Sequence, residues 1–255
     1  MLTDSHAHLD MEAFDEDREK VIQDALANGI SRIITVGIDL ESSIKALNLA
    51  KSHPSVFATV GCHPHDADKC SGEVLNGLAD LTSAPEIVAW GEIGLDFYRG
   101  YSAPENQVEV FEQQLAMARQ LHLPVIIHDR EAHEQVLSIL QKMGKGERQG
   151  VIHCFSGDVN LAYAFMDLGY YISIPGTVTY KKAAMVKEVA TAIPLERMLV
   201  ETDAPFLAPV PSRGKRNEPA FVAHTAREIA RLRNISFEEV AVQTAKNAKE
   251  LFGLV

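Results

Sequence analysis

Short apolar runs rich in β-branched residues alternate with longer segments of helical periodicity along the whole chain. Several of the short runs, such as residues 33–36 and 87–90, are apolar at nearly every position. Such runs are typical of parallel strands that are buried on both faces. The pattern predicts eight strands, over residues 1–5, 32–36, 56–61, 87–92, 125–128, 150–153, 170–174 and 198–203.

The segments between these strands carry apolar residues at spacings of three and four, which predicts amphipathic helices. Two further helices, over residues 220–233 and 236–251, follow the eighth strand. Eight strand–helix units in a chain of 255 residues match a TIM-like (β/α)8 barrel, an α/β fold of parallel strands with outer helices. We predict one such domain over residues 1–255, and a doubly wound open sheet is the alternative.

Polar residues at the ends of the predicted strands favour the barrel. Most of them stand where a strand finishes, and the carboxyl ends of eight different strands meet only when the sheet closes into a ring. An open sheet would scatter them. The residues concerned are His6, His8, His63, His65, Glu92, His128, His153 and Asp203.

The pair His6 and His8 is the strongest sign of a metal site. Residues two apart on an extended backbone face the same way, so both imidazoles project into one space. Together with Glu92, His128, His153 and Asp203 they provide six ligands, enough for two divalent ions if Glu92 bridges them. Imidazole and carboxylate suit Zn, Mn, Mg or Fe, so the ligands leave the metal open. The alternative is a set of histidines that each find a separate hydrogen-bond partner in the core.

The net charge of −11 argues against a protein that coats duplex nucleic acid through a basic surface. Bound divalent ions and a local basic loop can still supply positive charge for a phosphate substrate. Residues 212–217 provide such a loop, with Arg213, Lys215 and Arg216. No apolar run reaches the length of a membrane span, and the N-terminal residues do not resemble a signal peptide. Three cysteines without CxxC spacing suit a reducing compartment, so we expect a cytoplasmic protein without an obligate protein partner.

Six short segments, in this order along the chain, resemble the signatures of TatD-type metal-dependent deoxyribonucleases of the amidohydrolase superfamily. They are 5–8 (SHAH), 61–64 (GCHP), 91–96 (GEIGLD), 124–128 (PVIIH), 153–156 (HCFS) and 201–205 (ETDAP). The resemblance implies a TIM-like barrel with a metal centre that cleaves nucleic acid. It also implies that His6, His8, Glu92 and Asp203 bind one ion, and that Glu92, His128 and His153 bind the second.

The other polar residues at this end of the barrel receive supporting roles. We expect a metal-activated hydroxide to attack a phosphodiester while Asp203 takes up its proton, with Glu92 as the second catalytic residue. Glu201 lies on the same side of the strand as Asp203, where it either orients a ligand histidine or forms a buried ion pair. Contacts to the phosphate or sugar of the substrate are predicted for His63, His65, Asp96, Arg213 and Asn217, with structural loop hydrogen bonds as the alternative.

The leading hypothesis is a phosphodiester hydrolase that acts on DNA or nucleotides, either from an end or on single strands. A metal-dependent amide or ester hydrolase, including one that acts on aminoacyl-nucleic acid, is the first alternative, because the same centre can polarise a carbonyl group. A metal-binding scaffold without catalytic activity is the second. The basic loop at Arg213 favours a phosphate substrate.

Overall fold

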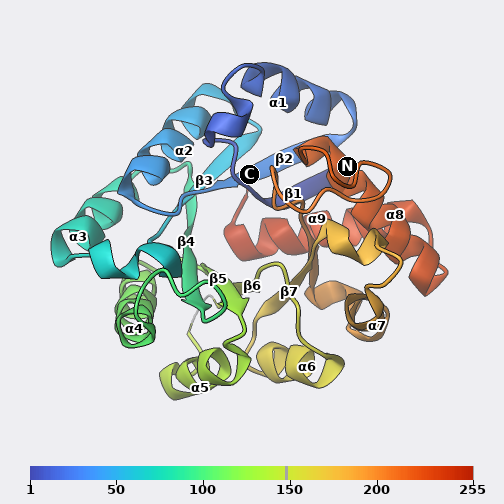
Figure 1. The fold of residues 1–255 in the computed structure, drawn as a ribbon. Helices are drawn as coiled ribbons and strands as arrows, with labels where there is room; N and C mark the ends of the chain where they lie inside the picture. Colours follow the sequence, from blue (N-terminus) through green and yellow to red (C-terminus); the bar gives the residue numbers. More distant parts are fainter. Residues whose placement is uncertain (147–148, 255) are drawn as a thin grey trace.

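The computed structural model describes residues 1–146 and 149–254, and within them eight parallel strands form one sheet in the order of the sequence. Figure 1 shows this sheet curling into a barrel surrounded by helices. The strands are β1 (Leu2–Ala7), β2 (Ile30–Val36), β3 (Val56–Val60), β4 (Ile87–Asp96), β5 (Val125–Arg130), β6 (Gly150–Ile152), β7 (Tyr171–Ile174) and β8 (Met198–Val200). All eight predicted strands are confirmed, with ends that differ by a few residues.

Hydrogen bonds just beyond β8 close the ring. Ala7 and Ala204 form a parallel bridge, and the backbone N–H of His8 donates to the carbonyl of Ala204 at 2.7 Å. The N–H of Asp203 donates to the carbonyl of His6 at 2.9 Å. The predicted barrel is therefore confirmed and the open sheet is wrong. The closure also joins two of the predicted ligand segments directly.

Helices cover the outside of the barrel, as their apolar stripes predict (Figure 1). They are α1 (Arg18–Ala27), α2 (Leu40–Ser52), α3 (Gly72–Leu81), α4 (Pro104–Gln120), α5 (His133–Met143), α6 (Val159–Asp167), α7 (Ala184–Ala192), α8 (Val222–Arg233) and α9 (Phe237–Phe252). Within residues 1–146 and 149–254, none of them is both long and apolar enough to cross a membrane.

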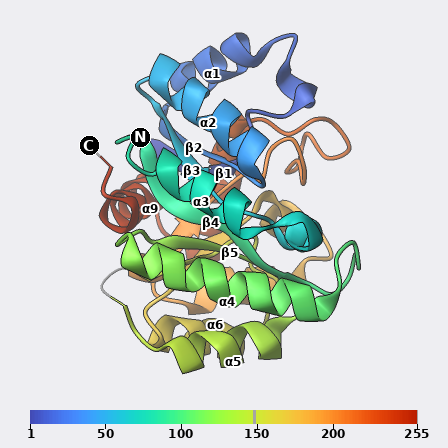
Figure 2. The same ribbon diagram turned by 90° about the vertical axis from the view of Figure 1, so that its left-hand side faces the viewer.

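The end of α9 closes the floor of the barrel. Leu251, Phe252 and Leu254 are buried in one cluster with strand residues such as Ile34 and Ile126. Figure 2 shows α9 and both chain termini on one side of the molecule, with the long loops on the opposite side. The apolar floor leaves that opposite, loop-bearing face for the polar residues at the strand ends.

The strand β8 is shorter than predicted, because side-chain hydrogen bonds replace backbone pairing at Thr202, although the N–H groups of Glu201 and Asp203 still donate to the carbonyls of Ile174 and His6. The carboxyl group of Asp4, fully buried in β1, accepts hydrogen bonds from the backbone N–H and the hydroxyl of Thr202, at 2.9 and 2.6 Å. Burial raises the pKa of Asp4 to about 8. This anchor holds the segment that carries Asp203 against β1.

Gly94 allows β4 and β5 to approach closely beside the site. Its φ of 142° lies in a region that side chains disfavour, and a Cβ added to it would lie 2.0 Å from the carbonyl oxygen of His128. Gly94 pairs with His128 in the sheet register, so Glu92 in β4 is brought next to the His128 side chain.

We expect Gly94→Ala to destabilise the fold by about 3 kcal/mol, because it adds a steric clash to an unfavourable backbone conformation. For a chain of this size the unfolding temperature should fall by roughly 10 °C, which thermal denaturation measures. The control is Gly100→Ala, since Gly100 also has a positive φ but has open space around the added methyl group. Equal losses in both variants would contradict the importance of the close approach.

Candidate metal centre

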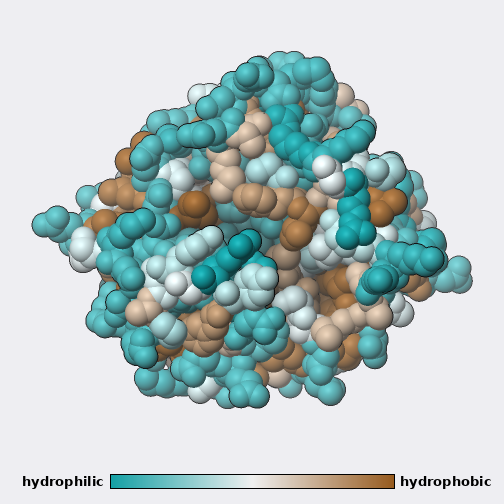
Figure 3. Space-filling model, viewed as in Figure 1, coloured by the Kyte–Doolittle hydropathy of each residue, from teal (hydrophilic) through white to brown (hydrophobic). Residues whose placement is uncertain are grey.

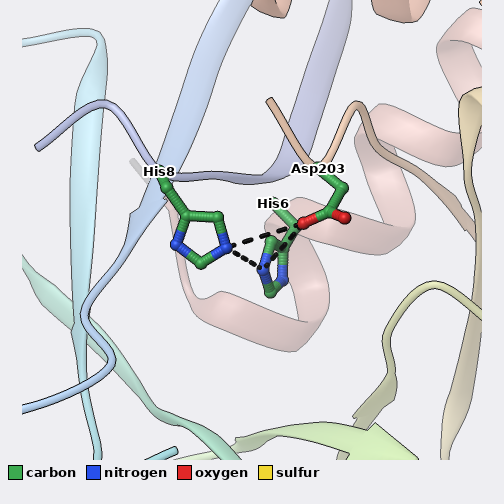
Figure 4. A group of neighbouring side chains, drawn as sticks. All are labelled: His6, His8 and Asp203. Carbon is green, nitrogen blue, oxygen red and sulfur yellow. Dashed lines mark hydrogen bonds and ion pairs between the residues drawn. The ribbon is translucent and has the colours of Figure 1, made fainter. Parts of the chain in front are cut away.

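His6, His8 and Asp203 bring three ligand atoms together at the junction of β1 and β8. The Nε2 atoms of His6 and His8 lie 3.3 Å apart, and Asp203 Oδ1 lies 3.8 and 3.5 Å from them. Figure 4 shows the two rings and the carboxylate pointing toward one another from two separate segments of the chain. The prediction that the histidine pair projects into one space is confirmed.

A second group surrounds the other side of Glu92. Glu92 Oε1 lies 2.7 Å from His128 Nδ1, 3.1 Å from His153 Nε2 and 3.5 Å from His63 Nε2. Ligand atoms of His63, Glu92 and His128 lie within 4.8 Å of one another. His63, predicted only as a substrate contact, therefore lies inside the cluster.

Glu92 joins the two groups, because its other oxygen faces the first one. Glu92 Oε2 lies 3.3 Å from His6 Nε2 and 3.8 Å from His8 Nε2. A single proton between the His6 and His8 nitrogens can satisfy only that one contact, whereas a divalent cation accepts electron pairs from both rings and both carboxylates. The donor set therefore fits divalent metal ions.

When no cation is bound, protons on the histidines balance the charge of the carboxylates. Burial alone would lower the pKa of His8, but Asp203 and Glu92 raise it to about 9. Burial likewise opposes the charge on His153, yet Glu92 and Glu201 hold its pKa well above the usual value. Burial would raise the pKa of Glu92, but the charges of His153, His63 and His6 hold it well below its usual range. Metal binding at this centre must therefore displace protons.

His65 and Asp96 lie beside the second group. The Asp96 side chain is fully buried, and its Oδ2 lies 2.7 Å from His65 Nε2 and 3.2 Å from His128 Nε2. Its Oδ1 accepts hydrogen bonds from the N–H groups of Tyr98 and Arg99. This position favours an orienting role for Asp96, whereas the partly exposed His65 remains accessible to a substrate.

Glu201 lies beneath His153. Its Oε1 lies 3.2 Å from His153 Nδ1 and accepts a hydrogen bond of 2.7 Å from the N–H of Cys154. His153 thus presents Nε2 to Glu92 and Nδ1 to Glu201, the contact that the predicted orienting role requires.

The two substrate contacts predicted in the loop after β8 lie in different surroundings, one exposed and one buried. Arg213 is exposed, with its guanidinium 4.5 Å from the ring centre of Tyr180. Arg216 instead forms ion pairs with Asp17 and Glu218, so it does not add a free charge to the loop. Asn217 is fully buried and donates to the carbonyls of Thr202 and Phe206. Its position favours holding the loop over contacting a substrate.

Two features of this centre were not predicted from the sequence. The inclusion of His63 with Glu92 depends on the close packing of β3 and β4, where a Cβ on Gly61 would lie 2.7 Å from the backbone of Gly91. The anchoring of Thr202 by Asp4 joins residues 198 positions apart. The glycine at position 61 was a visible signal for the first, and the charged residue inside an apolar strand was a signal for the second.

Comparison with known proteins agrees with this geometry. Residues 3–253 match the family model described as TatD related DNase. A Bacillus subtilis protein named "Uncharacterized metal-dependent hydrolase YabD" is 43% identical, over 99% of each chain. An Erwinia tasmaniensis protein named "3'-5' ssDNA/RNA exonuclease TatD" is 41% identical, over 94% of this chain and 95% of its own.

The fold comparison gives the same result. The crystal structure of YJJV, a TatD homolog from Escherichia coli, superposes with a TM-score of 0.94 at 32% identity, covering 100% of this chain and 98% of that one. The sequence match and the structural match both extend over nearly all of the chain. The chain therefore belongs to the family of TatD-related DNases and is a metal-dependent hydrolase.

Proposed function

We propose that this protein hydrolyses phosphodiester bonds in single-stranded nucleic acid, with DNA as its main substrate, from a free end. The observation that carries this proposal is Glu92, whose two oxygens face two separate groups of nitrogen ligands. Such an arrangement suits two divalent ions, a centre well matched to displacement at phosphorus. The relatives named as 3'-5' ssDNA/RNA exonucleases support the same substrate class.

The proposed ligands of one ion are His6, His8, Glu92 and Asp203. Those of the second are Glu92, His128 and His153, to which the geometry adds His63. When bound, the ions supply Lewis acidity toward water and the phosphate oxygens. The ion identity is proposed to be Zn, Mn, Mg or Fe, and the hydrolase domain is proposed to span residues 1–255.

Asp203 is the proposed proton acceptor. Its side chain is 14% exposed, compared with 3% for Glu92 and none for Asp96, so it is the carboxylate of these three that a water molecule reaches most easily. Burial opposes its charge, but the hydrogen bond from His8 and the charges of the neighbouring histidines lower its pKa. Asp203 is therefore a carboxylate at neutral pH and can take a proton from the attacking water.

We expect Asp203→Asn to lower kcat about 10²-fold or more, because the amide keeps the shape of the side chain but accepts no proton. The measurement is steady-state hydrolysis of an end-labelled DNA strand, together with metal analysis of the purified variant. Unchanged turnover would remove Asp203 from this role.

Two cations on this face, the exposed Arg213 and the half-buried Arg130, would hold the substrate phosphates. Arg213 after β8 and Arg130 at the end of β5 each lie over a tyrosine ring, at 4.5 Å from Tyr180 and 4.1 Å from Tyr98. Stacking fixes the planar guanidinium while its N–H groups remain available to phosphate oxygens. Local charge of this kind suits a single strand held near its end.

The proposal is tested by incubating the metal-loaded protein with four substrate classes: single-stranded DNA, duplex DNA, RNA and a set of esters and amides. Labels at the 5′ and 3′ ends distinguish the direction of digestion. Faster cleavage of single-stranded DNA than of the other classes supports the proposal. Cleavage of carbonyl substrates alone would favour the amide or ester hydrolase, and tight metal binding without turnover would favour a scaffold.

A further inference from the structure

Six imidazole rings form a continuous row across the face that carries the metal centre, and an exposed tyrosine or phenylalanine ring lies at each end. Neighbouring ring centres in this row are 3.8 to 6.2 Å apart. The row runs in the order Tyr101, His65, His63, His128, His153, His6, His8, Phe206. The two terminal rings therefore flank the whole cluster of candidate ligands.

The two rings come from opposite sides of the barrel. Tyr101 lies in the segment between β4 and α4, and Phe206 lies in the long loop after β8, four strands farther around the ring. In Figure 1 these green and orange loops lie on opposite sides of the barrel mouth, and Figure 2 places both on the same face of the molecule. A strand whose phosphate lies on the metal centre would extend toward both.

Both rings are exposed although they are largely apolar. Tyr101 is 64% exposed and Phe206 is 50% exposed. Each makes an edge contact with one histidine, at 4.8 Å between the centres of Tyr101 and His65 and at 6.2 Å between those of Phe206 and His8. Figure 3 shows pale and brown residues bordering the central hollow of this otherwise polar face. A ligand bound at this site can cover the apolar surface of both rings.

Tyr98 and Tyr180, in contrast, already have a stacking partner. Arg130 lies 4.1 Å from the centre of the Tyr98 ring, and Arg213 lies 4.5 Å from that of Tyr180. The guanidinium groups occupy one face of each ring, so these pairs suit phosphate binding. Among residues 1–146 and 149–254, the ring contacts of the two terminal rings are edge contacts with a histidine, which leaves ring surface for another planar group.

We propose that Tyr101 and Phe206 are two nucleobase-stacking subsites, one on each side of the phosphodiester that is cleaved. This inference rests on the proposed function. One ring takes the terminal base and the other takes the next base along the strand. Since both bases must be unstacked from any partner strand, the two rings select an unpaired end of at least two nucleotides.

The test measures strand binding by fluorescence anisotropy, using Asp203→Asn protein with divalent metal added, so that digestion is about 10²-fold slower during the measurement. The probes are a labelled single-stranded DNA and matched strands that carry an abasic residue at the terminal or the penultimate position. We expect Tyr101→Ala and Phe206→Ala each to raise Kd about 10-fold on the intact strand. Each variant should lose this effect on one of the two abasic strands, because the base that its ring contacts is already missing.

Tyr101→Phe and Phe206→Tyr keep a planar ring and should restore binding, whereas Tyr101→Leu and Phe206→Leu should not. The matched control is Tyr163→Ala, a 42% exposed tyrosine on the outer helix α6, which should leave Kd unchanged. Losses that are the same on intact and abasic strands, or full rescue by leucine, would overturn the stacking role. If the wild-type protein cleaves single-stranded DNA while both alanine variants bind normally, this inference fails and the proposed function stands. If the wild-type protein neither binds nor cleaves nucleic acid, both fail.

Discussion

Removal of divalent ions by a chelator will abolish hydrolysis and lower the unfolding temperature by on the order of 10 °C. We expect the ions to bind only the folded chain, because the candidate ligands lie in or just after six different strands. Saturating metal should therefore contribute about 4 kcal/mol, and a chain of this size changes its unfolding temperature by a few degrees for each kcal/mol. Activity assays and thermal denaturation before and after chelation measure both effects.

The stabilisation by metal should grow as the pH rises. In the metal-free protein the pKa of His8 is raised from 6.5 to about 9, so the stability that its charge contributes is complete below pH 6.5 and is lost as the pH approaches 9. Glu92 and Asp203 have lowered pKa values and stay negative throughout this range. Deprotonation of His8 leaves their charges less balanced, whereas bound cations still balance them.

We therefore expect a larger difference in unfolding temperature between the metal-loaded and metal-free protein at pH about 9 than at pH 6.5. The control is re-addition of Zn, Mn, Mg or Fe separately after chelation, which also identifies the ions that restore activity. A difference that shrinks with rising pH, or full activity in the presence of the chelator, would contradict the proposed centre.

Glu92→Gln should produce the largest loss among single substitutions, about 10³-fold in kcat/KM. The glutamine has almost the same shape, but it lacks the charge and the second carboxylate oxygen that face the two histidine groups. Several kcal/mol of transition-state stabilisation should be lost with the paired ions, which corresponds to this factor. We also expect the metal content to fall from the proposed two ions per chain toward one or none, as measured by elemental analysis.

Glu201→Gln is the matched control, because Glu201 is an equally buried carboxylate that hydrogen-bonds to His153 and has a ligand atom within 4.8 Å of those of His6 and His153. Loss of an orienting contact costs about 10- to 100-fold, so its effect should be clearly smaller. Circular dichroism establishes that both variants are folded. Two bound ions and near-normal turnover in Glu92→Gln would contradict the proposed bridging role of Glu92.

The ends of individual strands were predicted less accurately from sequence patterns than the strands themselves. The apolar runs predicted all eight strands, since burial on both faces requires apolar residues at successive positions. The run 198–203 nevertheless overestimated β8, because Asp4 takes over the hydrogen bonds of Thr202 from the neighbouring backbone. In β4 the strand continues to Asp96, beyond the predicted end, as Gly94 permits the close pairing with β5.

The substrate contacts show the same limit for the site. Asn217 and Arg216 lie in a polar loop whose sequence does not indicate which way each side chain points. The structure turns Asn217 inward to the backbone and ties Arg216 to Asp17, whereas Arg213 stays exposed. Side-chain direction in an irregular loop follows from tertiary partners, which no local periodicity encodes.

The sequence by itself determined the parallel α/β barrel, the family resemblance and the histidines and carboxylates at the strand ends. These follow from local regularities: strand and helix periods and polar residues at fixed positions relative to them. Only the tertiary structure decided that Glu92 faces both groups, that His63 lies among the candidate ligands, and that Tyr101 and Phe206 flank them. Those relations depend on the closure of the ring and the approach of distant strands, which bring together residues far apart along the chain.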